Sequence, residues 1–357
     1  MSKKDVGEAK KRLDKLVSKS RDQFYKPIQI AEILYQDRVG SSIDWNDVNT
    51  FRRQSTRWRN DMLVGLGRRP AVLNSRYEDQ LFDSEVLPPA MLRILAQENR
   101  RGAGIVELYI YHQLLRRRKL VINVRDWLSN IESSQFSFDE FLMFFEHKGL
   151  KRNTDKAYEI AVYALFDVLV RRLEAQVSLS IPDKNTGLLK EFEDFAVLVL
   201  GLDTGNMSIS QPARLYRVGA TNAADAGLDM WANFGPAVQV KHMSLDLDQV
   251  GEIVGGLDAE HIVIVCRDTE EKVIDAVMHQ TGVSDRVRGF VVHSDLVRWY
   301  SKCCNGEHAD GLGNELVHDL LAQFDVEFRT NEIERVKEMF VEREYSTDSL
   351  TELWKVC

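Results

Sequence analysis

The spacing of apolar residues changes near the middle of the chain, from a helical period to a mixed one. In the first half, apolar residues recur at steps of three and four over residues 8–19, which predicts an amphipathic helix. Pro27 is placed to open a second helix, because a proline in the first turn loses no hydrogen bond. Residues 37–43 have the composition of a turn. Further helices are predicted after Asp44, a candidate cap, and near 90–98, 104–118, 137–148 and 154–175.

The second half alternates short apolar runs with helical segments. The run HIVIVC at 261–266 is typical of a strand buried on both faces. The other predicted elements are helices at 188–201, 246–257 and 270–280, strands at 214–219, 227–233, 236–242 and 288–293, and an acidic helical tail at 311–357. This order predicts an α/β domain with a central mixed sheet flanked by helices.

A composition break at 176–187, QVSLSIPDKNTG, marks the predicted domain boundary. We therefore expect a mainly α-helical N-terminal domain at 1–180, the α/β domain at 181–305, and a helical C-terminal tail at 306–357 that serves packing or dimerisation. A chain of 357 residues with 44% hydrophobic and 29% charged residues suits two globular domains. No apolar run approaches the roughly 18–20 residues of a membrane span, and the charged N-terminus lacks the apolar core of a secretory signal. These features predict a cytoplasmic protein with no membrane partner.

Cysteine usage and charge narrow the chemistry further. The four cysteines contain no Cys-x-x-Cys pair and the eight histidines are scattered, so neither a disulfide framework nor a zinc site is indicated. The net charge of −8 argues at first against a polyanionic partner. Residues 1–180, however, hold 31 Lys and Arg against 24 Asp and Glu, a balance of +7, whereas residues 181–357 hold 16 against 31, a balance of −15. This asymmetry indicates a basic binding part joined to an acidic part whose carboxylates can hold cations.

The stretch DAGLDMWANFGPAVQVKH contains the candidate catalytic residues. Alternate residues of a strand share a face, so Gln239 and Lys241 are expected to project together. Val238 and Val240 then enter the core. Asp229 precedes Gln239 by ten residues across a short turn, and a hairpin would bring its carboxylate beside the amide and the amine. An acid, a neutral oxygen donor and a lysine at a sheet edge suit Mg²⁺-assisted hydrolysis of a phosphodiester.

The predicted helix at 188–201 supplies a further carboxylate. Its apolar positions are expected to pack against the sheet, and Glu193 borders that packed face, within reach of a metal or a metal-bound water. Asp225 is expected to shape the loop into Asp229 rather than to bind metal. His242 is expected to be a core or edge histidine, and His261 to have no chemical role.

The order of these residues resembles the PD-(D/E)xK nuclease fold. The matching positions, over residues 186–300, are Phe192-Glu193, Asp225-x-Gly227-x-Asp229 and Val238-Gln239-Val240-Lys241. The glutamine in place of the second acidic residue is similar to the Mrr-like branch. The resemblance implies Asp229 and Glu193 as Mg²⁺ ligands, Gln239 as a neutral ligand or orienting group, and Lys241 as the group that positions water or stabilises charge. The proline of the name-giving motif is absent, and the neutral glutamine leaves metal affinity to depend more heavily on the two carboxylates.

The whole chain, including SRDQFYKPIQIAEILYQDR at 20–38, also resembles the HaeII-type restriction endonucleases. This resemblance implies a bacterial type II enzyme that cleaves double-stranded DNA at the palindrome RGCGCY. Because a palindrome is two-fold symmetric, we expect a homodimer in which each subunit cuts one strand. A cognate DNA methyltransferase is implied as the functional partner in the same restriction–modification system.

The basic half contains one segment suited to reading bases, FRRQSTRWRNDM at 51–62. In a helix-turn-helix-like setting its arginines would enter a major groove and pair with guanine O6 and N7. A solvated helix that contacts phosphates at most is an equal alternative. The candidate DNA-binding residues, which flank an apolar seam of Phe51, Ser55 and Trp58, are Arg52, Arg53, Gln54, Arg57 and Arg59. A second basic run, at 116–119, is expected at the end of a helix, where it favours the helix dipole or touches phosphates.

The sequence therefore predicts a Mg²⁺-dependent type II restriction endonuclease. Two alternatives remain open. One is an Mrr-like, modification-dependent nuclease, which shares the site but reads methylated DNA. The other is a DNA-binding regulator whose nuclease core is inactive.

Overall fold

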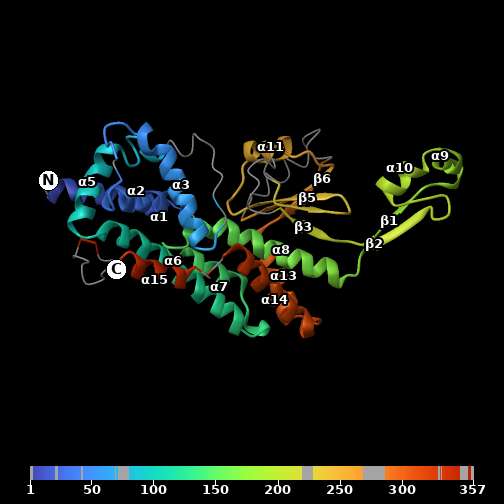
Figure 1. Cartoon of the computed structure of the whole chain (residues 1–357). Coiled ribbons are helices and arrows are strands. Elements are labelled where there is room, and N and C mark those ends of the chain that lie inside the picture. The colour runs from blue at the N-terminus through green and yellow to red at the C-terminus, as the bar shows by residue number, and fades with distance from the viewer. Residues whose placement is uncertain are drawn as a thin grey trace. The chain divides into compact units, whose positions relative to one another are not determined.

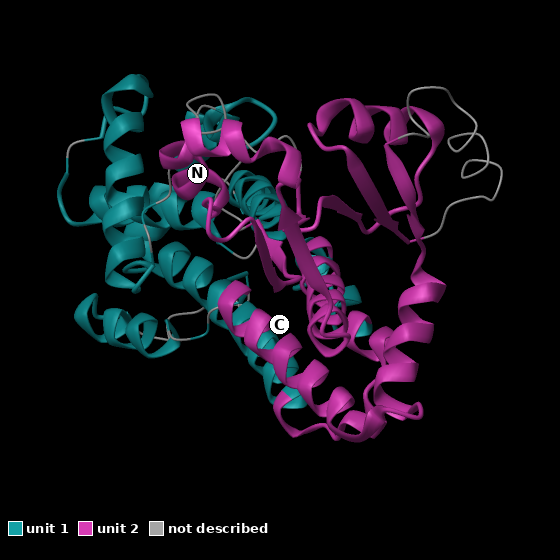
Figure 2. Cartoon of the chain, turned by 90° about the vertical axis from the view of Figure 1, so that its right-hand side faces the viewer, with its two compact units in different colours: residues 1–128, 143–154, 328–357 teal, residues 129–142, 155–327 magenta. Residues whose placement is uncertain are grey.

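The computed structural model describes residues 3–20, 23–41, 43–68, 70, 80–218, 228–267, 286–328, 330, 332–345 and 353–354. The chain divides into two compact units built from discontinuous segments (Figure 2). Unit 1 comprises residues 1–128, 143–154 and 328–357, and unit 2 comprises residues 129–142 and 155–327. The predicted boundary near residue 180 thus falls inside unit 2, and the predicted tail at 306–357 is divided between the units. Composition marked a local change at 176–187, which the structure shows to be the start of a strand rather than a boundary between units.

Unit 1 is helical and has one large apolar core, which includes Leu13, Ile30 and Leu95. The buried stripe of its longest predicted helix continues through Val124 and Leu128, so that helix ends far beyond residue 118. Its helices are α1 (Lys3–Lys19), α2 (Tyr25–Arg38), α3 (Asn49–Gly65), α5 (Pro89–Arg101), α6 (Ile105–Asn130) and α15 (Ile333–Glu342) (Figure 1). Among the described helices, none is long and apolar enough to cross a bilayer.

Buried ion pairs connect the C-terminal segment to the helices of unit 1. Glu332 pairs with Arg68 and Arg118, and Glu32 pairs with Arg343 at 2.8 Å. Arg117, also buried, donates to backbone carbonyl oxygens of α1 and the residue that follows it. The basic run at 116–119 therefore lies in the middle of α6, and its expected place at a helix end is wrong. A buried arginine that is already paired is not available to a phosphate.

Unit 2 contains the predicted mixed sheet, in the order β3-β4-β5-β6-β7. The pairs β3–β4 and β4–β5 are antiparallel, whereas β5–β6 and β6–β7 are parallel. The central strand β5 is buried from Pro236 to Val240, because both faces of the sheet are covered there. The strands are β3 (Leu215–Arg217), β4 (Met230–Ala232), β5 (Pro236–Lys241), β6 (His261–Cys266) and β7 (Val287–Val291).

Helices cover both faces of this sheet (Figure 1). On one face, α11 (Leu247–Gly256) packs Val250 and Val254 against β6, and its first turn is fixed by a capping box of Asp246 and Gln249. On the other lie α8 (Thr154–Arg172) and α13 (His293–Asn305). The helix predicted at 270–280 lies outside the described residues. The remaining elements are the long helix α14 (Ala309–Glu327), the short helix α7 (Phe138–Met143) and the 3-10 helices Gln80–Phe82, Ser133–Gln135, Phe144–Glu146, Lys151–Asn153 and Asp183–Asn185.

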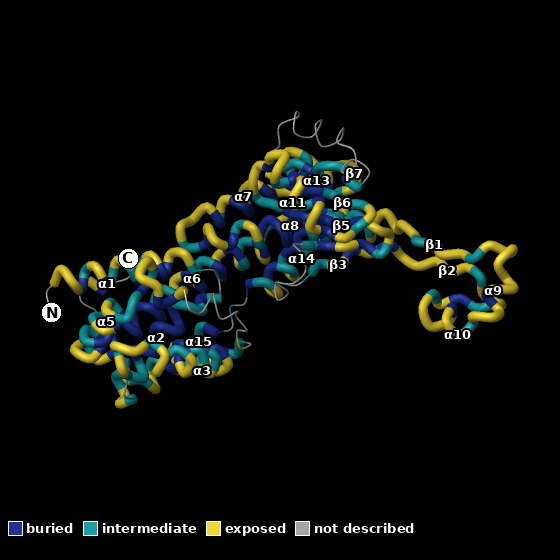
Figure 3. Tube along the Cα trace, turned by 90° about the horizontal axis from the view of Figure 1, so that it is seen from above, coloured by how far each residue is buried: buried dark blue, intermediate teal, exposed yellow. Residues whose placement is uncertain are grey.

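Between α8 and β3 the chain forms a second, two-stranded sheet. Strand β1 (Gln176–Ser180) pairs antiparallel with β2 (Ser208–Pro212), and α9 (Thr186–Glu191), α10 (Glu193–Phe195) and a π-helical segment at Ala196–Leu200 connect them. The single helix predicted over 188–201 is wrong, since it is interrupted at Phe192. Its packing against the sheet is wrong as well, because Phe195 and Leu198 are 54% and 85% exposed (Figure 3).

Candidate active site

The hairpin of β4 and β5 brings Asp229 to Gln239, as predicted. The Gln239 side-chain amide donates a hydrogen bond of 2.6 Å to Asp229 Oδ2, and the backbone N–H of Val240 donates one of 2.7 Å to the same oxygen. The turn between the strands contains Gly235 at φ 112°, a conformation that favours glycine. Val238 and Val240 are buried, which confirms their predicted place in the core, and Gln239 is only 2% exposed.

The electrostatic environment of Asp229 disfavours its ionised form. Burial raises the pKa of this carboxyl to about 6, and the negative charge of Glu159 adds to the rise. The hydrogen bond from Val240 and the positive charges of Lys241 and Lys156 act in the opposite direction without cancelling it. A cation bound beside Asp229 would stabilise the carboxylate, so the site is electrostatically suited to a metal ion.

Lys241 ends β5 and is partly buried. By strand alternation it shares a face with Gln239, and its ammonium is close enough to lower the pKa of Asp229. It forms no hydrogen bond or ion pair with any residue that the structure describes. The amine is therefore held at the site by its strand while its donors remain available.

Glu159 of α8 is a candidate site residue that sequence reasoning missed. It is 5% exposed and forms ion pairs with Lys156 at 2.5 Å and with Arg217 of β3 at 3.2 Å. Arg217 also pairs with Glu327, so its charge is shared between two carboxylates. The signal in the sequence was an acid within a helix face that is otherwise apolar, in the run AYEIAVYA. These ion pairs explain its burial, and its charge also raises the pKa of the Asp229 carboxyl, which makes it a candidate for chemistry.

Glu193 has a different environment from the one predicted. It lies in α10 and is exposed, and its carboxylate accepts hydrogen bonds from Thr204 N at 3.0 Å and Thr204 Oγ1 at 2.6 Å. These two hydrogen bonds lower the pKa of Glu193. Among the described residues, no hydrogen bond or ion pair joins Glu193 to Asp229, Gln239 or Lys241.

The remaining predicted residues of the segment divide into two groups. Asp225 and Gly227 lie outside the described residues. His242 is partly buried with its ring 5.1 Å from that of Tyr158, and burial lowers its pKa, so it is the core or edge histidine that was predicted. His261 begins β6, also as predicted.

The candidate DNA-binding helix is α3, and the structure separates its polar residues. Arg53, Gln54 and Arg57 are exposed, and Arg52 is partly exposed. Arg59 is fully buried and donates a hydrogen bond of 3.2 Å to Gln29 Oε1. The prediction that Arg59 contacts DNA is therefore wrong: it belongs to the packed interior between α2 and α3.

No group of three or more His, Cys, Asp or Glu side chains in the described part of the chain is arranged to hold a metal ion. The oxygen donors at the hairpin nevertheless suit a hard divalent cation. Asp229 offers a carboxylate, and Gln239 offers its amide oxygen because its nitrogen is committed to Asp229; Glu159 of α8 is a further carboxylate, with its two oxygens paired with Lys156 and Arg217. Because glutamine carries no charge, this candidate set contains two acids, Asp229 and Glu159. It therefore has less negative charge than a cluster of three acids.

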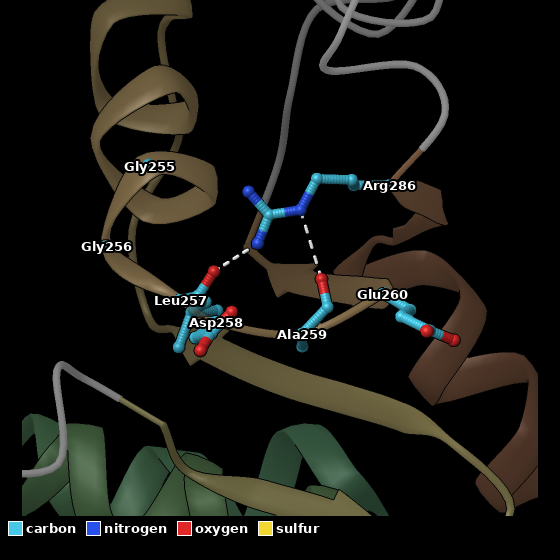
Figure 4. A pocket seen from close by; sticks show the side chains of 7 residues that line it. All are labelled: Gly255, Gly256, Leu257, Asp258, Ala259, Glu260 and Arg286. Carbon is cyan, nitrogen blue, oxygen red and sulfur yellow. Dashed lines mark hydrogen bonds between the residues drawn. The ribbon is translucent and has the colours of Figure 1, made fainter.

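A hollow at the C-terminal end of α11 is lined by Gly256, Asp258, Glu260 and Arg286, among others (Figure 4). The guanidinium of Arg286 donates to the carbonyl oxygens of Val254 and Ala259 at 3.0 Å, and to that of Leu257. It thereby satisfies backbone groups where the helix ends. This hollow is explained by structure and has no evident part in the chemistry.

Comparisons with known proteins identify the family of the chain. The family model described as "HaeII restriction endonuclease" matches residues 9–345. The chain is 40% identical over 343 residues to the "Type II restriction enzyme HaeII" of Haemophilus aegyptius, covering 96% of this chain and 97% of that one. It is also 40% identical over 328 residues to the "Type II restriction enzyme NgoBI" of Neisseria gonorrhoeae, covering 91% and 93% of the two chains. No solved structure matches the chain.

Proposed function

Because the chain belongs to the HaeII restriction endonuclease family, we propose that it cleaves double-stranded DNA at RGCGCY in a Mg²⁺-dependent reaction. Its enzyme class, type II site-specific deoxyribonuclease, follows from the family. The observation that supports the catalytic part of the proposal is the 2.6 Å hydrogen bond from Gln239 to Asp229. The positive charge of Lys241 lowers the pKa of the same Asp229 carboxyl.

In this proposal Asp229 and the amide oxygen of Gln239 would hold the metal, and Glu159 would be the further carboxylate ligand if it exchanged Arg217 or Lys156, its present partners, for the metal. When bound, Mg²⁺ would promote ionisation of water and neutralise negative charge on the scissile phosphate. Lys241 then orients the attacking water or stabilises the charge that develops on phosphorus. The water oxygen bonds to phosphorus and gives up one proton, the bond to the 3′-oxygen breaks, and that oxygen takes up a proton, which leaves a 5′-phosphate and a 3′-hydroxyl. We assign Glu159 the role first expected for Glu193, because the negative charge of Glu159 raises the pKa of Asp229, whereas Glu193 is exposed and hydrogen-bonded to Thr204.

For recognition, we assign base or phosphate contacts to the exposed face of α3, formed by Arg53, Gln54 and Arg57, with Arg52 beside it. The exposure of these side chains supports the assignment. A palindromic target further favours a homodimer, because a two-fold axis relates the two strands. A cognate DNA methyltransferase would protect the same sites in a bacterial cytoplasm.

The test uses two linear DNAs that differ only in whether one AGCGCT sequence is present. Cleavage of that DNA alone, with Mg²⁺ and not with EDTA, is the expected result. Cleavage restricted to methylated DNA would favour a modification-dependent nuclease. Tight binding without cleavage in either Mg²⁺ or Mn²⁺ would favour an inactive DNA-binding regulator.

A further inference from the structure

Two stacked aromatic rings are exposed beside the catalytic hairpin. Tyr216 of β3 and Trp231 of β4 lie directly opposite each other in the antiparallel register. Their ring centroids are 4.3 Å apart with an interplanar angle of 20°. Tyr216 is 38% exposed and Trp231 is 45% exposed, although large aromatic side chains usually gain more by burial. Phe234, in the turn that follows β4, is 38% exposed as well.

The register places this pair on the same face of the sheet as the catalytic residues. Trp231 follows Asp229 by two residues, and alternate residues of a strand share a face. Trp231 is also opposite Ala237 of β5, from which Gln239 and Lys241 follow by the same alternation. By this alternation the exposed aromatic pair and the proposed site residues project from the same side of the sheet, and the buried Ala237 and Gln239 lie between the pair and Lys241.

The spacing fits a bound DNA strand. Two residues along a strand span about 6.6 Å, so a phosphodiester held at Asp229 brings a neighbouring nucleotide to Trp231. The apolar parts of a nucleotide are its base and its deoxyribose, and aromatic side chains are the usual protein surfaces that stack on them. The positively charged groups of the proposed site are suited to the phosphates. The aromatic pair is suited to the apolar base and deoxyribose.

We propose that Tyr216 and Trp231 form a platform that packs against the base and sugar of a nucleotide adjacent to the scissile phosphate, and thereby positions the strand at Asp229. The inference rests on the proposed nuclease function. Both residues are positioning residues, because they act on the chemistry through the placement of DNA. A purely structural alternative is that the pair only stabilises the β3–β4 ladder, as cross-strand aromatic pairs do.

The experiment compares the full-length parent with Trp231→Ala, Tyr216→Ala and Trp231→Phe on a short duplex that contains AGCGCT. Steady-state cleavage is measured with Mg²⁺, and binding without divalent cation is measured by fluorescence anisotropy at several salt concentrations. Loss of one stacking contact is expected to raise KM and Kd about tenfold with kcat nearly unchanged. Trp231→Phe restores most of the affinity, because the ring face is retained. The slope of log Kd against log salt stays that of the parent, since no phosphate contact is lost.

Parent-like KM and Kd in both alanine variants would overturn the inference. So would a fall in kcat at unchanged KM, which indicates a distorted hairpin. If Trp231→Ala fails to fold, Tyr216→Ala carries the same test. Failure of the parent itself to bind or cut the duplex would refute the proposed function instead, so the two failures are distinguishable. Leu173→Ala, which removes another exposed apolar side chain, is the matched control and should behave as the parent.

Discussion

Gln239 holds the carboxylate of Asp229 by donating its side-chain amide hydrogen to Oδ2 at 2.6 Å. The glutamine is almost completely buried, so the partner that it needs is this carboxylate. The hydrogen bonds from Gln239 and from the backbone of Val240 both reach Oδ2, and Oδ1 of Asp229 accepts none from the described residues. A glutamine here orients the acid without adding a second negative charge beside it.

Cleavage should depend on the ionisation of Asp229. Its pKa of about 6 means that a proton competes with a metal ion for this carboxylate at mildly acidic pH. At subsaturating Mg²⁺, we expect the single-turnover rate to fall about tenfold per pH unit below about pH 6. Saturating Mg²⁺ should move the midpoint to lower pH, because the metal competes with the proton. A midpoint that does not respond to Mg²⁺ concentration would argue against Asp229 as a ligand.

Asp229→Asn should stabilise the protein at neutral pH in metal-free buffer. The folded-state pKa of Asp229 lies above the ordinary value of 3.8, so the folded protein binds this proton more tightly than the unfolded chain does. The stability due to protonation is present below about pH 4 and is lost as pH rises through about 6. After allowance for partial exposure, the variant should gain on the order of 1 kcal/mol at pH 7 and little at pH 4. Urea unfolding at both pH values measures this difference, and an equal effect at both would refute the explanation.

Lys241→Ala should impair the chemical step while leaving DNA binding largely intact. The ammonium ends the central strand beside Asp229, where it can act on the water or on the developing charge. Loss of such a group lowers kcat by roughly 100- to 1000-fold. Quenched single-turnover cleavage measures the rate, and electrophoretic mobility shift without Mg²⁺ measures binding. A variant that cuts as fast as the parent would remove Lys241 from the mechanism.

The hairpin that joins Asp229 to Gln239 was predictable because its determinants are local. Strand alternation fixes which side chains share a face, and a short turn with Gly235 fixes which residues are opposite. Glu159 was not predictable in this way, because its effect on Asp229 joins segments far apart in the sequence. The helical period of α8 showed a buried face but not which acid on that face would meet the hairpin.

Predictions from the amphipathic pattern were also wrong in places. The pattern shows that a helix has an apolar face, but it does not show which part of the protein covers that face. The segment at 188–201 has the composition of a packed helix, yet Leu198 is 85% exposed. On α3, the opposite error arose: Phe51, Ser55 and Leu63 form the buried stripe at steps of four, and Arg59 falls on the same stripe. The positive charge of Arg59 suggested a DNA contact, whereas its position on the buried stripe of α3 places its side chain in the interior.

The arginines of α3 should therefore separate into two classes. Arg59→Ala removes a buried guanidinium and takes away its hydrogen bond to Gln29 Oε1, which should lower the free energy of unfolding by about 2–4 kcal/mol. Arg53→Ala and Arg57→Ala should leave stability within about 0.5 kcal/mol and weaken DNA binding. If they read bases, the Kd for the specific duplex rises by more than the Kd for a random duplex. Equal losses on both duplexes would make them phosphate contacts, and no loss on either would remove α3 from the interface.

Glu159→Gln and Glu193→Gln form a matched pair that decides which carboxylate belongs to the site. Both substitutions remove one negative charge and retain the side-chain shape. Glu159 is buried and its charge raises the pKa of Asp229, whereas Glu193 is exposed and hydrogen-bonded to Thr204. We expect Glu159→Gln to lower kcat by roughly 100-fold and to weaken the apparent affinity for Mg²⁺, because a ligand charge is lost. Glu193→Gln should cleave at nearly the parental rate.

A second measurement separates catalysis from folding in the Glu159 variant. Removal of the charge of Glu159 should lower the pKa of Asp229, so the residual activity should persist to lower pH than in the parent at the same Mg²⁺ saturation. A protein merely weakened by the loss of the ion pair with Arg217 would instead show reduced thermal stability with an unchanged pH midpoint. If Glu193→Gln loses activity while Glu159→Gln retains it, the two-stranded module of β1 and β2 supplies the second acid, and the site must then be rebuilt around Glu193.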